Sequence, residues 1–320
     1  MRILVITSEW PTKEHQEYVP FLVNEVNRLR NYGLGIEIFS FTGHKNPINY
    51  LKAWISIRKS YDISSFDLIH AEWGQSALLA LPKKLPLVVT LRGSDLEGIV
   101  DSKGRYTFAG RILRMVSRFV ARIADHVIVV SESLAKYIPD VPHTVVPVCL
   151  DTTLFNPIDK EEARKKLNLP LDRKLILFAS NPNRPEKRFF LAKEAVDLLK
   201  EKTELIVTNR IPHDQMALFF NACDVLLITS SHEGSPTIVY EALACNLPIV
   251  SVDVGDVRKR IENINGCYIS QNDDPNEIAQ CLKKVLSNDE RIDGFSKIIE
   301  FDTEHFCNSM KDIYESSLRR

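Results

Sequence analysis

The most informative part of the chain is a segment with two glutamates, Glu233 and Glu241, on either side of an expected helix start. Residues 224–230 before it form an apolar run that is typical of a buried parallel strand. The Gly-Ser-Pro sequence at 234–236 then favours a tight turn, an N-cap at the serine and a first helical position at the proline. Free backbone amides and the positive end of a helix dipole would converge there, which predicts an anion-binding site.

The two carboxylates indicate which anion would fit between them. Carboxylate oxygens accept hydrogen bonds, so Glu233 and Glu241 could bind hydroxyl groups on either side of a phosphate. A phosphate flanked by polyols describes a nucleotide-sugar, which would be a co-substrate rather than a resident cofactor. The alternative is an ordinary helix start with capping carboxylates and no ligand.

The same segment carries a family resemblance. The Glu-x7-Glu pattern of Glu233 and Glu241, followed by residues 242–255, resembles family 4 of the retaining glycosyltransferases. The resemblance implies the GT-B fold, an α/β architecture of two Rossmann-like, doubly wound parallel-sheet domains that face a cleft. It also implies that the second domain binds the nucleoside-diphosphate sugar and the first domain binds the acceptor.

The resemblance assigns residues to the donor. Pro185-Glu-Lys187 is similar to the family loop whose lysine meets the donor pyrophosphate, and Arg184 is the nearest substitute for a family arginine that would fall at Pro182. A positioned cation stabilises the charge that develops on the leaving diphosphate. The alternative is that both residues are solvated loop charges. With Glu241 on the ribose, the expected donor-binding residues are Gly234, Ser235, Pro236, Thr237, Ile238, Glu241 and Arg210.

The acceptor side rests on the end of another strand. Thr90-Leu-Arg-Gly-Ser-Asp95 resembles the family's His-Gly-x-Asp, with an arginine in place of the histidine. The resemblance implies that Asp95 contacts the transferred sugar or the acceptor, so the expected catalytic residues are Glu233, Lys187, Asp95 and Arg184. The expected acceptor-binding residues are Arg92, Gly93, Ser94 and His70. The alternatives are a turn capped by Asp95 and a structural histidine.

Four arginines recur at spacings of three and four within residues 103–122, beside an apolar face: Arg111, Arg114, Arg118 and Arg122. Such a helix could rest on an anionic membrane surface, or it could present an ordinary solvated face.

Strand-like and helical runs alternate through both halves, which predicts parallel, doubly wound sheets. The expected domains are residues 1–150 and residues 151–297, with residues 298–320 forming a helix that packs back on the first domain or simply completes the second.

Composition limits the function classes. The first 150 residues hold 18 Lys and Arg against 14 Asp and Glu, whereas the whole chain has a net charge of −1 and a pI of about 6.7. A near-neutral chain without an aromatic-basic platform disfavours nucleic acid as a partner. No run of 18 apolar residues and no signal peptide are evident, so we expect a cytoplasmic protein, peripheral at the membrane if the arginines bind lipid. Six cysteines without a C-x-x-C pair indicate buried thiols, and no metal site is expected.

The sequence therefore predicts a metal-independent, hexosyltransferase-type retaining glycosyltransferase. It would move a sugar from a nucleoside-diphosphate sugar to a hydroxyl of a glycan or lipid-linked acceptor in cell-surface polysaccharide assembly. Two alternatives stay open, which are a sugar-nucleotide 2-epimerase and a non-catalytic sugar-nucleotide-binding subunit.

Overall fold

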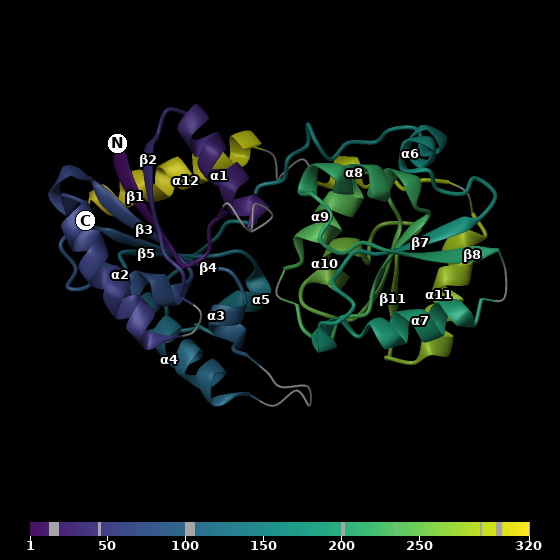
Figure 1. The fold of residues 1–320 in the computed structure, drawn as a ribbon, viewed down its shortest axis with the longest axis horizontal. Coiled ribbons are helices and arrows are strands. Elements are labelled where there is room, and N and C mark those ends of the chain that lie inside the picture. The colour runs from purple at the N-terminus through teal and green to yellow at the C-terminus, as the bar shows by residue number, and fades with distance from the viewer. Residues whose placement is uncertain are drawn as a thin grey trace. The chain divides into compact units, whose positions relative to one another are not determined.

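The computed structural model describes residues 1–12, 19–43, 46–99, 106–199, 202–233, 235–288, 290–298 and 303–319. The chain divides into two compact units (Figure 1). Unit 1 consists of Met1–Cys149 and Thr303–Arg320, and unit 2 consists of Leu150–Asp302.

Unit 1 is built on a six-stranded parallel sheet with the order β2-β1-β3-β4-β5-β6. The two central strands β3 and β4 are buried along their whole length, as expected for strands covered on both faces. The strands are β1 (Arg2–Thr7), β2 (Gly35–Ser40), β3 (Leu68–Glu72), β4 (Leu87–Leu91), β5 (His126–Val129) and β6 (Thr144–Val145).

Helices cover both faces of this sheet. One core contains residues of α2, η2 and α4, and the other contains residues of α1 and α12. The C-terminal helix α12 therefore belongs to unit 1 although it follows unit 2 in the sequence (Figure 1). The helices of unit 1 are α1 (Pro20–Asn31), α2 (Pro47–Ser60), η1 (Ile63–Ser65), η2 (Gly74–Ala80), α3 (Ser94–Glu97), α4 (Phe108–Ile123), α5 (Glu132–Ala135) and α12 (Thr303–Leu318).

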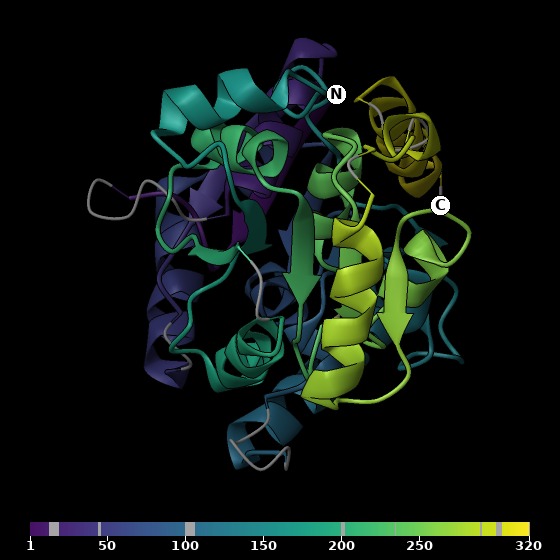
Figure 2. The same cartoon turned by 90° about the vertical axis from the view of Figure 1, so that its right-hand side faces the viewer.

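Unit 2 is built on a five-stranded parallel sheet with the order β11-β10-β9-β7-β8. Its apolar core extends from the sheet into the helices on both sides, and α11 lies along the strands (Figure 2). The strands are β7 (Lys174–Phe178), β8 (Thr203–Val207), β9 (Val225–Ile228), β10 (Ile249–Val252) and β11 (Tyr268–Ser270). The helices are α6 (Lys160–Leu167), η3 (Pro185–Lys187), α7 (Phe189–Asp197), α8 (His213–Ala222), α9 (Thr237–Ala244), α10 (Val257–Ile261), α11 (Pro275–Leu286) and η4 (Phe295–Lys297).

The predicted fold class is confirmed, because both units are parallel α/β sheets wound in two directions from an internal first strand. Within the described part of the chain, each helix is either too short or too polar to cross a bilayer. The six cysteines are free, and five of them are buried.

Candidate donor site in unit 2 and charged network in unit 1

Unit 2 has a topological switch point between β7 and β9. The chain leaves β7 toward β8 on one side and reaches β9 on the other side, so the loops after these two strands diverge. In open parallel sheets, ligands bind in the crevice that such loops leave at the carboxyl ends of the strands. The loop after β7 contains Lys187, and the loop after β9 contains Glu233.

These two side chains meet at the switch point. The Lys187 ammonium lies 2.5 Å from the Glu233 carboxylate, and the two side chains are only 17% and 15% exposed. Two hydrogen bonds join the loops, because Ser231 N–H donates to the Glu186 carbonyl at 2.8 Å and the Thr229 hydroxyl donates to the Lys187 carbonyl at 2.9 Å. A cation and a carboxylate are thus held at the position where this fold binds ligands.

The arginine that follows Lys187 strengthens the same junction. Arg188 adopts a left-handed backbone conformation with φ of 49°, and its Nε donates to the Thr229 carbonyl at 2.6 Å. Its guanidinium also pairs with Asp273, which follows β11. Arg188 therefore ties the loops after three strands together.

Helix α9 begins at Thr237, so the expected N-cap at Ser235 and first helical position at Pro236 are wrong. The helix runs from Thr237, its N-cap position is Pro236, and no side chain caps it. The Ser235 hydroxyl instead donates to Asp256 at 2.9 Å and lies 3.0 Å from the Tyr240 hydroxyl. The initial amides of a helix lack partners within it, so Thr237 and Ile238 still begin a potential anion site. Gly234 lies outside the described residues.

Glu241 lies further along α9 and is paired with a residue from another helix. The Glu241 residue is 8% exposed, and its carboxylate lies 2.9 Å from Nε2 of His213, the first residue of α8. Burial lowers the pKa of His213, but the hydrogen bond to Glu241 and the charges of Glu241, Asp151 and Asp214 together leave the net pKa raised. A proton on His213 is therefore stabilised next to the expected ribose ligand.

The remaining donor-side residues lie apart from this pair. Arg184 is 57% exposed at its side chain and pairs with Glu186, its near neighbour. Arg210 is exposed in the loop after β8, with φ of 58°. Pro236 is buried.

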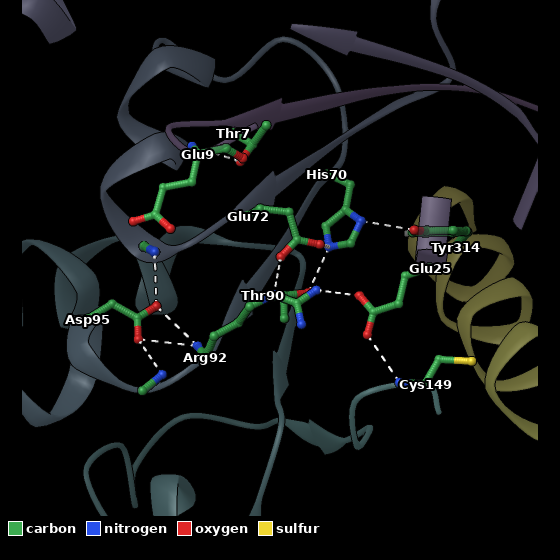
Figure 3. Close-up of polar contacts among 12 residues, drawn as sticks. Thr7, Glu9, Glu25, His70, Glu72, Thr90, Arg92, Asp95, Cys149 and Tyr314 are labelled. Carbon is green, nitrogen blue, oxygen red and sulfur yellow. Dashed lines mark hydrogen bonds and ion pairs between the residues drawn. The ribbon is translucent and has the colours of Figure 1, made fainter. Parts of the chain in front are cut away.

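In unit 1 the structure gives Arg92 a different environment from the one expected. Its side chain is 8% exposed and donates to Glu25 on α1 and to Glu72 at the end of β3, both at 2.6 Å (Figure 3). Burial lowers the pKa of Arg92, but the two carboxylates raise it by more than burial lowers it. The net pKa is therefore raised, and the guanidinium stays charged. Two internal carboxylates already compensate this cation, which corrects the expectation that it binds an anionic acceptor.

The two carboxylates respond in opposite ways. Burial and the charge of Glu72 raise the pKa of Glu25 in spite of Arg92, whereas Arg92 holds the pKa of Glu72 below its usual value despite burial. The Nη1 atom of Arg92 has no hydrogen-bond partner among the described residues, and the network borders a cavity of about 20 Å³. Such a cavity has room for one water molecule.

Asp95 is also internal, which corrects its expected contact with a substrate. The residue is 0% exposed, and its carboxylate accepts hydrogen bonds from the backbone N–H groups of Gly93 at 2.9 Å and Gly74 at 3.2 Å. The amide of Arg92 donates to it as well (Figure 3), and so does the amide of Leu96. Asp95 therefore shapes the turn after β4. Ser94, the first residue of α3, is exposed.

His70 has a structural environment. It is 3% exposed, its Nε2 lies 2.7 Å from the Thr90 hydroxyl, and its Nδ1 lies 2.9 Å from the Tyr314 hydroxyl of α12 (Figure 3). Burial lowers its pKa, although Glu72 opposes this effect. A neutral His70 thus links β3 and β4 to the C-terminal helix.

The four arginines of α4 do not share one solvent face. Arg118 donates to the Tyr137 carbonyl, and the Arg114 guanidinium lies over the rings of Tyr106 and Tyr137. Only Arg111 and Arg122 belong to the exposed side of the helix. The expected arginine stripe is therefore corrected to two outward cations.

Sequence reasoning missed several members of both clusters. Arg188 could have been found as the residue next to Lys187, and Glu25 as an acid within the apolar face of an amphipathic helix. Tyr314, Asp256 and Glu72 had no local signal, because their partners are distant in sequence.

Comparisons with known proteins agree with this fold and these motifs. Residues 1–154 match the model of Glycosyltransferase Family 4, and residues 162–288 match the model of Glycosyl transferases group 1. The two matches cover nearly all of both units, so the chain belongs to the family 4, group 1 glycosyltransferases.

Curated relatives have related descriptions. The chain is 32% identical over 216 residues to a putative teichuronic acid biosynthesis glycosyltransferase, TuaC, of Bacillus subtilis, covering 60% of this chain and 54% of that protein. It is 24% identical over 278 residues to D-inositol 3-phosphate glycosyltransferase 1 of Catenulispora acidiphila, covering 71% of this chain and 65% of that protein. The matches therefore span less than two thirds of either relative.

Solved structures share the fold. A sucrose-phosphate synthase of Thermosynechococcus elongatus superimposes with a TM-score of 0.79 at 16% identity, over 99% of each chain. Anabaena HepE in complex with UDP and glucose superimposes with a TM-score of 0.73 at 13% identity, over 99% of this chain and 100% of that chain. These similarities place both units within the GT-B fold.

Proposed function

We propose that the chain transfers a sugar from a nucleoside-diphosphate sugar to a hydroxyl group of a glycan or lipid-linked acceptor, with retention of configuration. The observation that carries the proposal is the position of Lys187 and Glu233. They meet where the loops after β7 and β9 diverge, beside the start of α9.

Each part of the donor has a matching group in unit 2. The diphosphate would lie against Lys187 and the first amides of α9, where a cation and a helix dipole favour negative charge. The ribose hydroxyls would donate to Glu241, whose position His213 supports. Glu233 would accept hydrogen bonds from the sugar that is transferred.

The transfer balances without a further reactant. The bond between the anomeric carbon and the diphosphate oxygen breaks as the acceptor oxygen forms a bond on the same face of the sugar. The acceptor's proton passes to the leaving phosphate, and Lys187 stabilises the charge that grows there. This route gives the protein no metal-dependent step, so we propose that the transfer is metal-independent.

Relatives named for teichuronic acid biosynthesis and for lipopolysaccharide core biosynthesis support a role in cell-surface polysaccharide assembly. The acceptor is then a growing glycan or its lipid carrier. The exposed Ser94 in the turn after β4 is the expected acceptor-side residue that stays open to such a substrate.

The first test is a titration of the chain with UDP, GDP and ADP, followed by turnover of the matching nucleotide-sugars in EDTA-containing buffer. We expect Glu241→Ala to weaken binding of the preferred nucleotide by roughly 1–3 kcal/mol, because hydrogen bonds to the ribose are lost. Glu262→Ala, at an exposed position of the same unit, is the control.

Equal nucleotide affinity in wild type and Glu241→Ala would refute the donor site. Conversion of the free nucleotide-sugar into an isomer, with no sugar on any acceptor, would identify an epimerase instead. Donor binding without any turnover, unaffected by Lys187→Ala, would identify a non-catalytic binding subunit.

A further inference from the structure

An apolar surface on unit 1 is left exposed by two helices, α2 and α4. Phe108 is 80% exposed, Met115 65%, and Ile48 and Leu51 59% each. The outward side chains of these two helices form what we call the α2–α4 surface: Ile48, Leu51, Ile55, Phe108, Ile112, Met115 and Phe119. Their spacing follows the turns of each helix, so each helix presents a continuous apolar stripe.

The two stripes belong to the same layer of the fold. Ala53 and Ile57 of α2 and Val120 and Ala121 of α4 enter one apolar core on one face of the sheet. Both helices also pack on η2, which contributes residues to the same core. The outward sides of α2 and α4 therefore look away from the same sheet face, opposite to the face covered by α1 and α12.

The charge of these helices is of one sign. Neither α2 nor α4 contains an aspartate or a glutamate. The outward cations are Lys52, Lys59, Arg111 and Arg122, whereas Arg58, Arg114 and Arg118 are held against the protein. On these two helices the exposed apolar side chains are thus accompanied by basic groups alone.

This combination selects one occupant. A second copy of the chain would bring the same cations together across the interface, which like-charge repulsion disfavours. A purely solvated face would not carry exposed Phe, Met and Ile side chains at helical spacing. A bilayer with anionic headgroups satisfies both features, because it accepts apolar side chains at the acyl boundary and binds Lys and Arg at its surface.

We propose that the α2–α4 surface docks unit 1 on an anionic lipid bilayer. Phe108, Met115 and Phe119 enter the boundary between headgroups and acyl chains, and Arg111 and Arg122 lie on lipid phosphates. The helices lie in the plane of the membrane and do not span it. Docking is independent of the proposed glycosyl transfer, because it involves none of the donor-site residues.

The test is sedimentation of the full chain with vesicles of phosphatidylcholine, with and without phosphatidylglycerol. We expect binding to the anionic vesicles, weakened by salt. The variant with Phe108→Ser and Phe119→Ser should lose roughly tenfold or more in partitioning, because apolar insertion is removed. Phe190→Ser, at a 62% exposed position of unit 2, is the matched control and should bind as wild type does.

A second pair of variants tests the contribution of the basic side chains separately from that of apolar insertion. The variant with Arg111→Glu and Arg122→Glu should lose binding to anionic vesicles, whereas Lys193→Glu with Lys283→Glu, on exposed faces of α7 and α11, should retain it. Leu51→Ser with Ile55→Ser tests the contribution of α2. All of these positions are exposed, so thermal unfolding should stay close to wild type and report that each variant is folded.

Three results would overturn the proposal. One is equal binding of wild type to neutral and anionic vesicles, and another is unchanged binding after both phenylalanines are replaced. The third is a dimer in light scattering that Phe108→Ser dissociates, which would assign the surface to a second copy of the chain. The assay uses neither donor nor acceptor, so its outcome is separate from that of the activity measurements.

Discussion

At the scale of single residues, unit 2 places two charge pairs where a donor is expected, and each has a distinct chemical use. Lys187 with Glu233 lies at the divergence of the loops after β7 and β9. Glu241 with His213 lies one helix turn further from the start of α9. In the proposed mechanism the first pair would stabilise negative charge that develops on the leaving group, and the second would bind the two ribose hydroxyls.

We expect Lys187→Ala to lower kcat by roughly a hundredfold, with a smaller change in KM, since electrostatic stabilisation of a transition state falls mainly on turnover. Steady-state kinetics with the preferred donor would measure both constants. Lys193→Ala, at an exposed position of α7, is the control. A change confined to KM would mean that Lys187 binds the donor equally in the ground state.

The His213–Glu241 pair predicts a pH dependence of stability. Burial lowers the pKa of His213, but Glu241, Asp151 and Asp214 together raise it above its usual value, so the folded state holds the proton more tightly than the unfolded state. The stabilisation is therefore complete below the pKa of an unfolded histidine, about 6.5, and is lost as pH rises through the higher folded pKa.

Urea unfolding of wild type and His213→Gln across this pH window measures the effect. The difference in free energy of unfolding should be largest at the acidic end and should shrink as pH rises. His143→Gln is the control, because the His143 ring contacts the carbonyl of Val141 rather than a carboxylate. A difference that grows with pH would contradict the assignment.

At the scale of elements, α12 is attached to unit 1 by both apolar packing and a polar contact. Phe306, Met310 and Ile313 enter the core beside α1. The Tyr314 hydroxyl contacts His70, which is connected through Glu72 to Arg92 (Figure 3). A chain of polar contacts therefore connects helix α12 to Arg92 in the turn after β4.

We expect Tyr314→Phe to destabilise the chain by about 1–3 kcal/mol, because Nδ1 of the buried His70 loses its partner. Chemical denaturation would give the value. Tyr268→Phe is the control, since this partly exposed ring lies beside Lys284 and keeps that contact without its hydroxyl. Equal stability of the two variants would show that the Tyr314 hydroxyl contributes nothing.

At the scale of the whole molecule, unit 1 is assembled from two separated parts of the chain. Its second core would be uncovered without Thr303–Leu318. Large apolar side chains contribute about 1.5–3 kcal/mol each when buried, and a domain is stable by only about 5–15 kcal/mol. Loss of α12 therefore approaches the total stability of unit 1.

A chain that ends at Ile298 should lose cooperative folding of unit 1 while unit 2 stays folded. Hydrogen exchange would show fast exchange in β1 and β3 and retained protection in β9 and β10. A chain that ends at Leu318 is the control and should behave as wild type does. Protection of β1 and β3 without α12 would contradict this account.

Much of the fold could be predicted because its signals are local. Alternating strands and helices identify parallel sheets. The run expected as a strand at 224–230 contains β9 (Val225–Ile228), and the strand end expected at Thr90–Asp95 is the end of β4 at Leu91. The pairing of Lys187 with Glu233 could not be derived from spacing, since they are 46 residues apart. Loop direction at the switch point brings them together.

The sequence by itself determined the architecture and the family, whereas the anion-binding role of the segment around α9 stays a prediction. Those properties depend on hydrophobic period, turn chemistry and helix termini, which act over a few residues. Only the tertiary structure decided that Asp95 and Arg92 are buried among internal partners and that Phe108 and Met115 are outside. Burial is decided by packing between distant segments, which an isolated motif or helix face does not specify.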